Sequence, residues 1–291
     1  MQVGTFLPTY WTTYGASTVA EAVRETALAA AELNYASLWA NDHVLAPAHR
    51  AEMGYIAEPL TTLASVIHLA PTLTLGTSTL VLPQRDAIVV AKQAATLDVL
   101  SGGRFILGVG VGWQEEEFAM LGADFAQRGA VADEAVAVMR ALWSEERATF
   151  HGSYYDFADA VFHPKPTAGR VPLWVCGNTP AAIRRAARLG DAWNPFCISL
   201  AEFTAGVAAL RADHHGRPMP LIAAHMQIRI GEAAGPPAHL SGSAPEVLAA
   251  LRGYREAGMD YLICDFVAPD LPDLLRQMRV MAQQVTPALV G

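Results

Sequence analysis

Short apolar runs alternate with longer amphipathic stretches along the whole chain. Eight runs rich in branched and aromatic residues have the length of buried strands: residues 2–8, 35–41, 73–82, 105–112, 172–177, 191–196, 221–230 and 261–267. The stretches that follow them have helical periodicity: residues 16–33, 58–69, 86–100, 114–121 with 128–144, 180–189, 200–213, 244–257 and 271–285. Each predicted strand is therefore followed by a predicted helix, which favours a parallel sheet.

Eight strand–helix units in 291 residues predict an α/β fold of the (β/α)8 type, a TIM barrel, with residues 1–291 in a single domain. An open doubly wound sheet is the alternative, and the number of units favours the barrel. Residues 145–170 interrupt the alternation. Because a Gly152-Ser153 turn lies there between aromatic residues, we expect a hairpin inserted before the fifth strand.

The composition is typical of a large folded core. Hydrophobic residues make up 52% of the sequence and charged residues 16%, whereas disordered chains are poor in apolar residues. The net charge of −8 argues against a nucleic-acid-binding protein, which needs a basic face to meet the phosphates. A small anionic ligand is compatible with this charge, because a local pocket can oppose the overall sign.

Three further features narrow the class of protein. The three cysteines have no CxxC spacing, and no cluster of His and Glu has metal-ligand spacing, so we expect no disulfide framework and no metal site. The uncharged run 59–84 contains His68 and Pro71, which favours a buried helix and strand over a membrane span. The chain opens on a strand pattern without a secretory signal, so we expect a cytoplasmic protein.

In a (β/α)8 barrel the chemistry lies at the carboxyl ends of the strands. Asp42 and His43 directly follow the second strand, and a His in this place can transfer a proton near neutral pH. The alternative is a turn with an exposed His. The fourth strand carries Gly108, Gly110 and Gly112 at every second position, so one of its faces lacks side chains. Such a face indicates close approach by another group, either a flat ligand ring or the packed barrel itself.

The fifth strand runs into Gly177, Asn178, Thr179 and Pro180. Asn178 or Thr179 can cap the helix that follows, and Pro180 suits its first position. Free N–H groups at this helix N-terminus can bind a phosphate. A capped helix without a ligand is the alternative.

Two other groups of polar residues lie near predicted strand ends. The seventh strand places His225, Gln227 and Arg229 on one face, where Arg229 could reach an anion or the three could form an internal network. Three acidic residues at 115–117 follow Trp113 and begin a helix, and the helix macrodipole is a sufficient reason for them.

Taken in order, these stretches resemble the bacterial luciferase-like monooxygenase superfamily, in particular its coenzyme F420-dependent oxidoreductases. The resemblance covers nearly the full chain, and its most specific segments are residues 76–83, 94–118, 150–155, 164–166 and 172–193. It implies a deazaflavin in the barrel mouth, hydride transfer to or from a small organic substrate, and a homodimer.

The resemblance also implies roles for single residues. His43 would be the catalytic acid or base, and Asp42 would contact the edge of the deazaflavin. A non-proline cis peptide between Ser78 and Thr79 would support the back of the ring. The other cofactor-binding residues that it implies are Gly110, Val111, Gly112, Gly177, Asn178 and Thr179.

Trp113 departs from the family's pattern. In its sugar-phosphate dehydrogenases a Glu directly follows the glycine strand and works with the His of the second strand, so Trp113 favours a more apolar substrate. The alternatives are an FMN-dependent monooxygenase and a non-catalytic flavin-binding barrel. A Schiff-base aldolase is disfavoured, because neither Lys92 nor Lys165 lies at a strand end.

Overall fold

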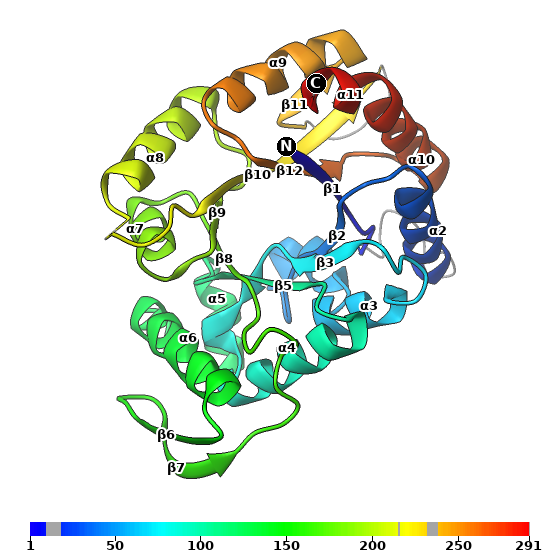
Figure 1. Ribbon diagram of the computed structural model, residues 1–291. Coiled ribbons are helices and arrows are strands. Elements are labelled where there is room, and N and C mark those ends of the chain that lie inside the picture. Colours follow the sequence, from blue (N-terminus) through cyan, green and yellow to red (C-terminus); the bar gives the residue numbers. More distant parts are fainter. Residues whose placement is uncertain (10–18, 215, 232–237, 291) are drawn as a thin grey trace.

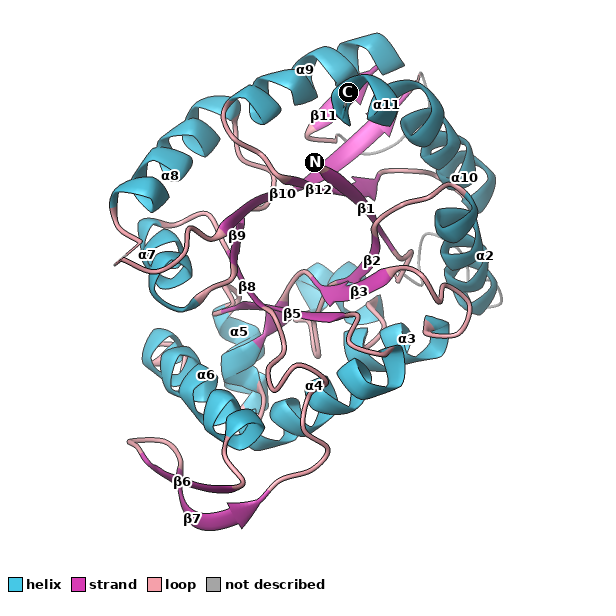
Figure 2. Cartoon of the chain, viewed as in Figure 1, coloured by secondary structure: helices cyan, strands magenta, loops and turns pink. Residues whose placement is uncertain are grey.

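The described part of the chain closes into a parallel β-barrel surrounded by helices. The computed structural model describes residues 1–9, 19–214, 216–231 and 238–290. Within them, eight parallel strands pair in a ring (Figures 1 and 2): β1 (Gln2–Phe6), β2 (Ser37–Ala40), β3 (Thr74–Thr77), β5 (Phe105–Gly110), β8 (Leu173–Cys176), β9 (Ala192–Asn194), β10 (Leu221–Ile230) and β12 (Tyr261–Phe266). Because β12 pairs with β1, the ring is closed and the predicted (β/α)8 barrel is confirmed.

The helices lie around this ring (Figure 2): α2 (Val19–Glu32), α3 (Pro59–Val66), α4 (Ala87–Ser101), α5 (Glu115–Leu121), α6 (Arg128–Ser144), α7 (Pro180–Leu189), α8 (Leu200–Ala212), α9 (Ala244–Glu256), α10 (Leu271–Val280) and α11 (Thr286–Val290). Their ends carry the expected signals. At the start of α4, the Asp86 carboxylate accepts hydrogen bonds from two free N–H groups, and after its end Gly102 adopts a left-handed φ of 70°.

The hairpin predicted within residues 145–170 is present and lies outside the barrel (Figure 1). Its strands β6 (Arg147–His151) and β7 (Asp156–Val161) pair antiparallel just before β8. Glu134 of α6 fixes the turn, because its carboxylate accepts hydrogen bonds from three successive N–H groups there.

Aromatic side chains fill the inside of the barrel. Trp39 is fully buried there; its ring centroid lies 4.8 Å from that of Trp174, and it meets Tyr261 edge-on. Gly76 leaves room for it, because a Cβ atom on Gly76 would lie 2.3 Å from Trp39 Cζ3. The barrel interior is therefore a packed core and not a pore.

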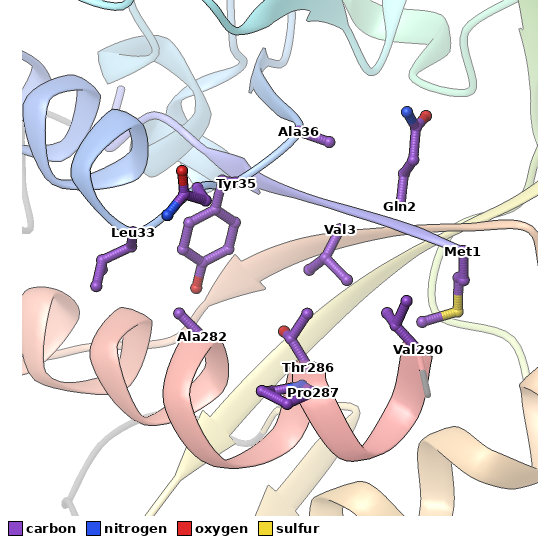
Figure 3. A pocket seen from close by; sticks show the side chains of 11 residues that line it. Met1, Gln2, Val3, Leu33, Tyr35, Ala36, Ala282, Thr286, Pro287 and Val290 are labelled. Atoms are coloured by element: carbon purple, nitrogen blue, oxygen red, sulfur yellow. The ribbon is translucent and has the colours of Figure 1, made fainter.

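A cavity of about 380 Å³ lies at the amino ends of β1 and β2 (Figure 3). Met1, Val3, Tyr35 and Thr286 are among its lining residues, and none of its lining side chains carries a charge. The Tyr35 hydroxyl donates a hydrogen bond to the Met278 carbonyl oxygen. This end of the barrel therefore offers little acid–base chemistry, in contrast to the carboxyl ends of the strands.

The third strand differs from the prediction. The sequence predicts one strand over residues 73–82, whereas β3 ends at Thr77 and β4 (Leu80–Val81) continues along β5. The peptide between Ser78 and Thr79 is cis, as expected. The strand breaks here because the Thr77 hydroxyl takes the place of a backbone partner in the sheet. It donates a hydrogen bond to the Gly108 carbonyl oxygen and accepts one from the Gly108 N–H.

Other differences are smaller. Residues 16–18 of the first predicted helix lie outside the described residues. The last predicted helix, 271–285, consists of α10 and a π-helical turn, η3 (Met281–Val285), before α11. Four short elements were not predicted, because so few residues show no clear periodicity: η1 (Ala48–Tyr55), η2 (Leu82–Gln84), β11 (Leu240–Gly242) and α11.

Candidate active site

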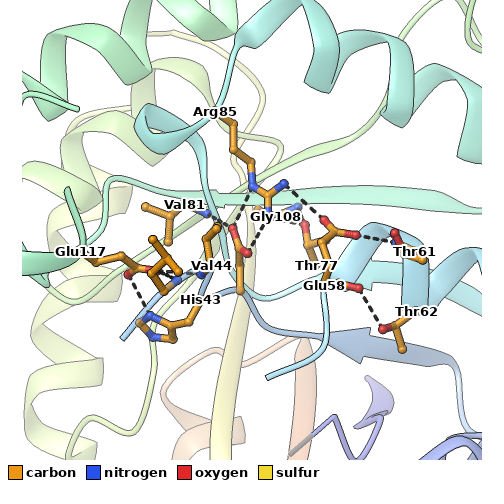
Figure 4. Close-up of polar contacts among 12 residues, drawn as sticks. His43, Val44, Glu58, Thr61, Thr62, Thr77, Val81, Arg85, Gly108 and Glu117 are labelled. Carbon is orange, nitrogen blue, oxygen red and sulfur yellow. Dashed lines mark hydrogen bonds and ion pairs between the residues drawn. The ribbon is translucent and has the colours of Figure 1, made fainter. Parts of the chain in front are cut away.

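His43 lies just past the carboxyl end of β2 and is paired with a carboxylate. Its Nδ1 lies 2.9 Å from Glu117 Oε2 (Figure 4). The other Glu117 oxygen accepts hydrogen bonds from the N–H groups of Val44 at 2.7 Å and Leu45 at 3.1 Å. Glu117, on α5, therefore holds both the imidazole and the backbone that follows it.

Glu117 is buried, yet it is poised to be ionised. Burial by itself raises the pKa of its carboxyl, but the hydrogen bonds from His43 and from the N–H groups of Leu45 and Val44 outweigh it and hold the pKa below its ordinary value. An ionised carboxylate can only accept hydrogen bonds, so His43 Nδ1, which contacts it, must carry the hydrogen. Among the described residues no partner is found for His43 Nε2, which leaves this nitrogen for proton exchange with a ligand.

Asp42 points to a different set of partners. Its carboxylate forms a two-pronged ion pair with Arg85, at 3.1 and 2.7 Å, and accepts a hydrogen bond from the Val81 N–H. Arg85 also contacts Glu58 at the start of α3 (Figure 4). Burial raises the pKa of the Asp42 carboxyl, although the hydrogen bond and charge of Arg85 oppose this shift. Asp42 thus ties β2 to the segment after β3, and its contact with a cofactor stays a prediction.

The rim of the barrel mouth near His43 is apolar. The Trp113 ring meets the His43 ring edge-on, with centroids 6.2 Å apart, and it is 55% exposed. Val44 and Leu45 are also exposed. Arg50 of η1 places its guanidinium 5.1 Å from the Trp113 ring centroid. Among the described residues around His43, aromatic and aliphatic surface therefore lies beside the guanidinium of Arg50.

The glycines of β5 make room for the chain itself. A Cβ atom on Gly108 would lie 1.9 Å from the Thr77 carbonyl oxygen, and one on Gly110 would lie 2.6 Å from Thr79 Cγ2. At Gly112, where φ is 77°, it would approach Phe118. The close approach inferred from the sequence is therefore made by the segment around the cis peptide. Contacts of Gly110, Val111 and Gly112 with a cofactor stay a prediction.

The predicted phosphate site lies where β8 leads into α7. The Thr179 hydroxyl caps the helix by accepting from the Ala182 N–H at 3.2 Å. The Asn178 amide forms two hydrogen bonds with the Phe196 backbone, as donor at 2.7 Å and as acceptor at 2.8 Å. Gly177 has a φ of 130°, which favours glycine. These side chains are engaged within the protein, so the backbone is left as the means of holding a phosphate.

A third group of polar side chains lies inside the mouth. His225 of β10 places Nδ1 3.2 Å from the Ser78 hydroxyl, and Asn194 of β9 donates to the same hydroxyl at 2.8 Å. Cys176 lies beside them, and burial raises the pKa of its thiol to about 11, so it is not a nucleophile at neutral pH. The polar face predicted for the seventh strand thus contributes His225 to a hydrogen-bond network inside the barrel mouth.

The sequence does not identify three residues of this site. The helix macrodipole is a sufficient reason for Glu117, and no role is expected for Arg85 or Asn194. The signal for Glu117 was weak, because three successive acids make the inward-facing one indistinguishable by sequence. Arg85 follows the expected strand directly, which is where a barrel presents its chemistry. In the described residues, no group of three or more His, Cys, Asp or Glu side chains could hold a metal ion, and no helix is long and apolar enough to cross a membrane.

Comparison with known families identifies one match. The profile of the family described as luciferase-like monooxygenase matches residues 1–234. Curated relatives include the F420-dependent glucose-6-phosphate dehydrogenase of Intrasporangium calvum, 38% identical over 168 residues, which are 56% of this chain and 49% of that protein. The enzyme of the same name from Amycolatopsis mediterranei is 33% identical over 57% of this chain and 50% of its own length. The chain thus spans about half the length of these relatives.

Two solved structures share the fold over nearly their full length. The monooxygenase RslO1 of Streptomyces bottropensis superimposes with a TM-score of 0.84 at 21% identity, covering 99% of both chains. An F420-dependent secondary alcohol dehydrogenase in complex with an F420-acetone adduct gives a TM-score of 0.83 at 19% identity, covering 99% of this chain and 98% of its own. At such identities the likeness shows the shared architecture.

Proposed function

The chain belongs to the luciferase-like monooxygenase family, a family of oxidoreductases, and from this premise we propose that it is a coenzyme F420-dependent oxidoreductase. It would transfer a hydride between the deazaflavin and a small organic substrate. The names of the curated relatives support the F420 branch of the family.

The pairing of His43 with Glu117 carries the proposal. A hydride transfer to or from a carbon that bears oxygen needs a proton to move at that oxygen. His43 Nδ1 is held by Glu117 at 2.9 Å, which leaves Nε2 to accept the proton of a substrate alcohol or to donate one to a carbonyl oxygen. The ionised Glu117 stabilises the imidazolium that forms in the first case.

The barrel mouth fits a cofactor that carries polar ring atoms. His225 Nε2 and Asn194 Oδ1 are buried there and have no hydrogen-bond partner within the described protein. Bound F420 would supply the hydride chemistry. The residues proposed to hold it are Asp42, Ser78, Thr79, Gly110, Val111, Gly112, Gly177, Asn178 and Thr179.

We propose an apolar substrate, such as a secondary alcohol or ketone with hydrophobic substituents. Trp113 stands where a sugar-phosphate dehydrogenase of the family has a Glu, and with Val44 and Leu45 it forms an exposed apolar rim. Phosphate recognition usually relies on several basic groups. Arg50, at the edge of this rim, already lies against the Trp113 ring.

Two alternatives remain. An FMN-dependent monooxygenase is the runner-up, because the fold is shared with a monooxygenase of 3,6-diketocamphane whose structure contains FMN. A non-catalytic flavin-binding barrel would bind a cofactor without turnover. The fold alone separates none of these functions.

Turnover with a substrate panel tests the proposal. The purified protein is incubated with F420 and a series of secondary alcohols of increasing apolar size, and the loss of the oxidised deazaflavin absorbance is followed. We expect reduction of F420 that increases with substrate apolarity and is absent with glucose 6-phosphate. Oxygen consumption with reduced FMN, and none of this F420 reduction, would instead establish the monooxygenase.

We also keep the expectations of one domain, a cytoplasmic location and a homodimer. The exposed side of α4 carries large aliphatic side chains, which are Ile88, Val89, Val99 and Leu100. These side chains lie at the two ends of the helix, with Lys92 exposed between them, and we propose that they contribute to the dimer interface. Sedimentation of the protein as a monomer at micromolar concentration would refute the dimer.

A further inference from the structure

Two buried polar atoms in the barrel mouth lack hydrogen-bond partners in the described protein, and we assign one as a donor and the other as an acceptor. His225 is 6% exposed and Asn194 is 1% exposed. Neither His225 Nε2 nor Asn194 Oδ1 has a hydrogen-bond partner in the described protein. An unsatisfied buried atom destabilises a fold, and because these two lie in the barrel mouth they indicate a ligand with matching groups.

Both side chains are oriented by Ser78. Asn194 Nδ2 donates to the Ser78 hydroxyl oxygen at 2.8 Å, which fixes Asn194 Oδ1 as the free end of the amide. His225 Nδ1 lies 3.2 Å from the same hydroxyl. The Asn194 and His225 side chains come from the adjacent strands β9 and β10 and both reach the Ser78 hydroxyl, so the two side chains lie side by side in the barrel mouth.

The contacts of His225 favour the tautomer that carries the hydrogen on Nε2. If Ser78 donates to Nδ1, the neutral imidazole must hold its proton on Nε2. The opposite tautomer would turn the Nε2 lone pair toward the Asp265 carboxylate, whose Oδ2 is 3.8 Å away, and this is unfavourable. His225 Nε2 is therefore a donor, whereas Asn194 Oδ1 is an acceptor.

The donor has a fixed direction. The His225 ring is stacked on Phe6, with centroids 4.4 Å apart and an interplanar angle of 17°. The Phe196 ring meets it at 62° from another side, with centroids 4.6 Å apart. These contacts hold the ring in one orientation, so its N–H is pre-organised for a ligand atom.

We propose that His225 and Asn194 recognise the imide edge of the cofactor ring. The pyrimidinedione ring of a deazaflavin or a flavin carries an N–H group beside carbonyl oxygens. The His225 N–H would donate to a ring carbonyl, and Asn194 Oδ1 would accept from the ring N–H. A ketone oxygen would satisfy only His225, and an alcohol hydroxyl that donated to Asn194 Oδ1 would not present its proton to His43, so we assign the pair to the cofactor; this assignment rests on the proposed function.

Cofactor binding and the spectrum of the bound ring test this assignment without turnover. F420 and FMN are titrated separately into the wild-type protein and into His225→Phe and Asn194→Leu. The phenyl ring preserves the stacking on Phe6 and removes the donor. We expect each variant to weaken the cofactor that the wild type binds by about two- to tenfold, as one hydrogen bond contributes, and to shift the absorption maximum of the bound ring.

Thr26→Val is the matched control. Thr26 Oγ1 is also buried without a partner in the described protein, but it lies on α2 outside the barrel. Its loss should leave the cofactor dissociation constant and the absorption spectrum unchanged.

An analogue methylated at the imide nitrogen makes the test independent of folding. Wild-type protein should bind this analogue more weakly than the parent cofactor. Methylation should weaken binding less in Asn194→Leu, because the oxygen that accepts from the imide N–H is already absent there. Such non-additivity is the signature of direct contact. Full additivity, or unchanged affinity and spectrum in both variants, overturns the inference while the proposed function stands. If the wild type binds neither cofactor, both fall.

Discussion

At the scale of single residues, His43 is held at Nδ1 by Glu117 and is available at Nε2. We predict that His43→Ala lowers turnover by about 10²–10⁴, the usual contribution of one general acid or base. Cofactor affinity should change little, because the His43 side chain is not among the groups proposed to bind it. Steady-state kinetics with F420 and the best alcohol of the panel provide the measurement.

A second His–carboxylate pair serves as the control. His151 Nδ1 lies 3.0 Å from Asp156 Oδ1 on the exposed hairpin. His151→Ala should therefore retain wild-type turnover. Equal rates for His43→Ala and the wild type would show that the proton comes from another group.

Glu117 should make the stability of the folded protein depend on pH. Its pKa is lowered in the folded state, so its contribution is present above the unfolded pKa of about 4.3 and is lost as the pH falls through the folded pKa. We predict that Glu117→Gln unfolds at lower urea concentration than the wild type at pH 7, and that this difference shrinks below about pH 4.

The neighbouring acid separates this effect from a general change of charge. Glu116 has a 59% exposed side chain, so Glu116→Gln should lose about 0.3–1 kcal/mol of stability, the contribution of an exposed charge at a helix N-terminus, and should stay closer to the wild type than Glu117→Gln at pH 7. A constant difference between Glu117→Gln and the wild type from pH 7 to pH 3 would mean that Glu117 acts through packing alone.

Sequence alone located His43 but not its partner. His43 could be predicted because it follows an apolar strand, and strand ends are where barrels carry chemistry. Glu117 lies 74 positions further along the chain, and only the three-dimensional path of α5 brings it to the imidazole. Asp42 shows the same limit, because its ion pair with Arg85 could not be inferred from its place in the turn.

At the scale of elements, the contact between β3 and β5 depends on a missing side chain. We predict that Gly108→Ala destabilises the protein by about 3 kcal/mol, because the new Cβ would lie 1.9 Å from the Thr77 carbonyl oxygen. Urea unfolding followed by circular dichroism measures this change in free energy.

Gly129 on α6 is the matched glycine. A Cβ atom there would meet only the flexible end of Arg185, at 3.2 Å. Gly129→Ala should raise stability by about 0.5–1 kcal/mol, the gain expected within a helix. Equal effects of the two substitutions would contradict the packing described for β3 and β5.

The start of α7 is the predicted phosphate site. We predict that Asn178→Asp weakens cofactor binding by about two- to fivefold. The new carboxylate would repel the phosphate and would partly neutralise the positive end of the helix macrodipole that attracts it. Gln283→Glu adds the same charge beside Ala282, which lines the cavity of Figure 3, and should have no effect. Unchanged affinity in Asn178→Asp would rule out this placement of the phosphate.

Elements with strong periodicity were predicted more accurately than irregular ones. The helices α6 and α7 and the strand β10 have the predicted bounds. The break between β3 and β4 was not visible in the pattern, because Thr and Ser are compatible with a strand. The Thr77 hydroxyl instead bonds to the neighbouring strand β5, and the Ser78 hydroxyl contacts His225 of β10.

At the scale of the whole molecule, the fold could be predicted because its signal repeats. Eight alternations of strand and helix leave few topologies, whereas each site residue depends on contacts between distant segments. The side chains of Asn194 and His225 illustrate this, since both contact the Ser78 hydroxyl only after the barrel has closed.

The central claim is that this barrel is built for F420. An equilibrium titration of the purified protein with F420 and with FMN, at the same ionic strength and followed by fluorescence, tests it most directly. The account predicts saturable binding of F420 that is tighter than that of FMN and is weakened in Asn178→Asp. Tighter binding of FMN, or no binding of F420, would contradict it.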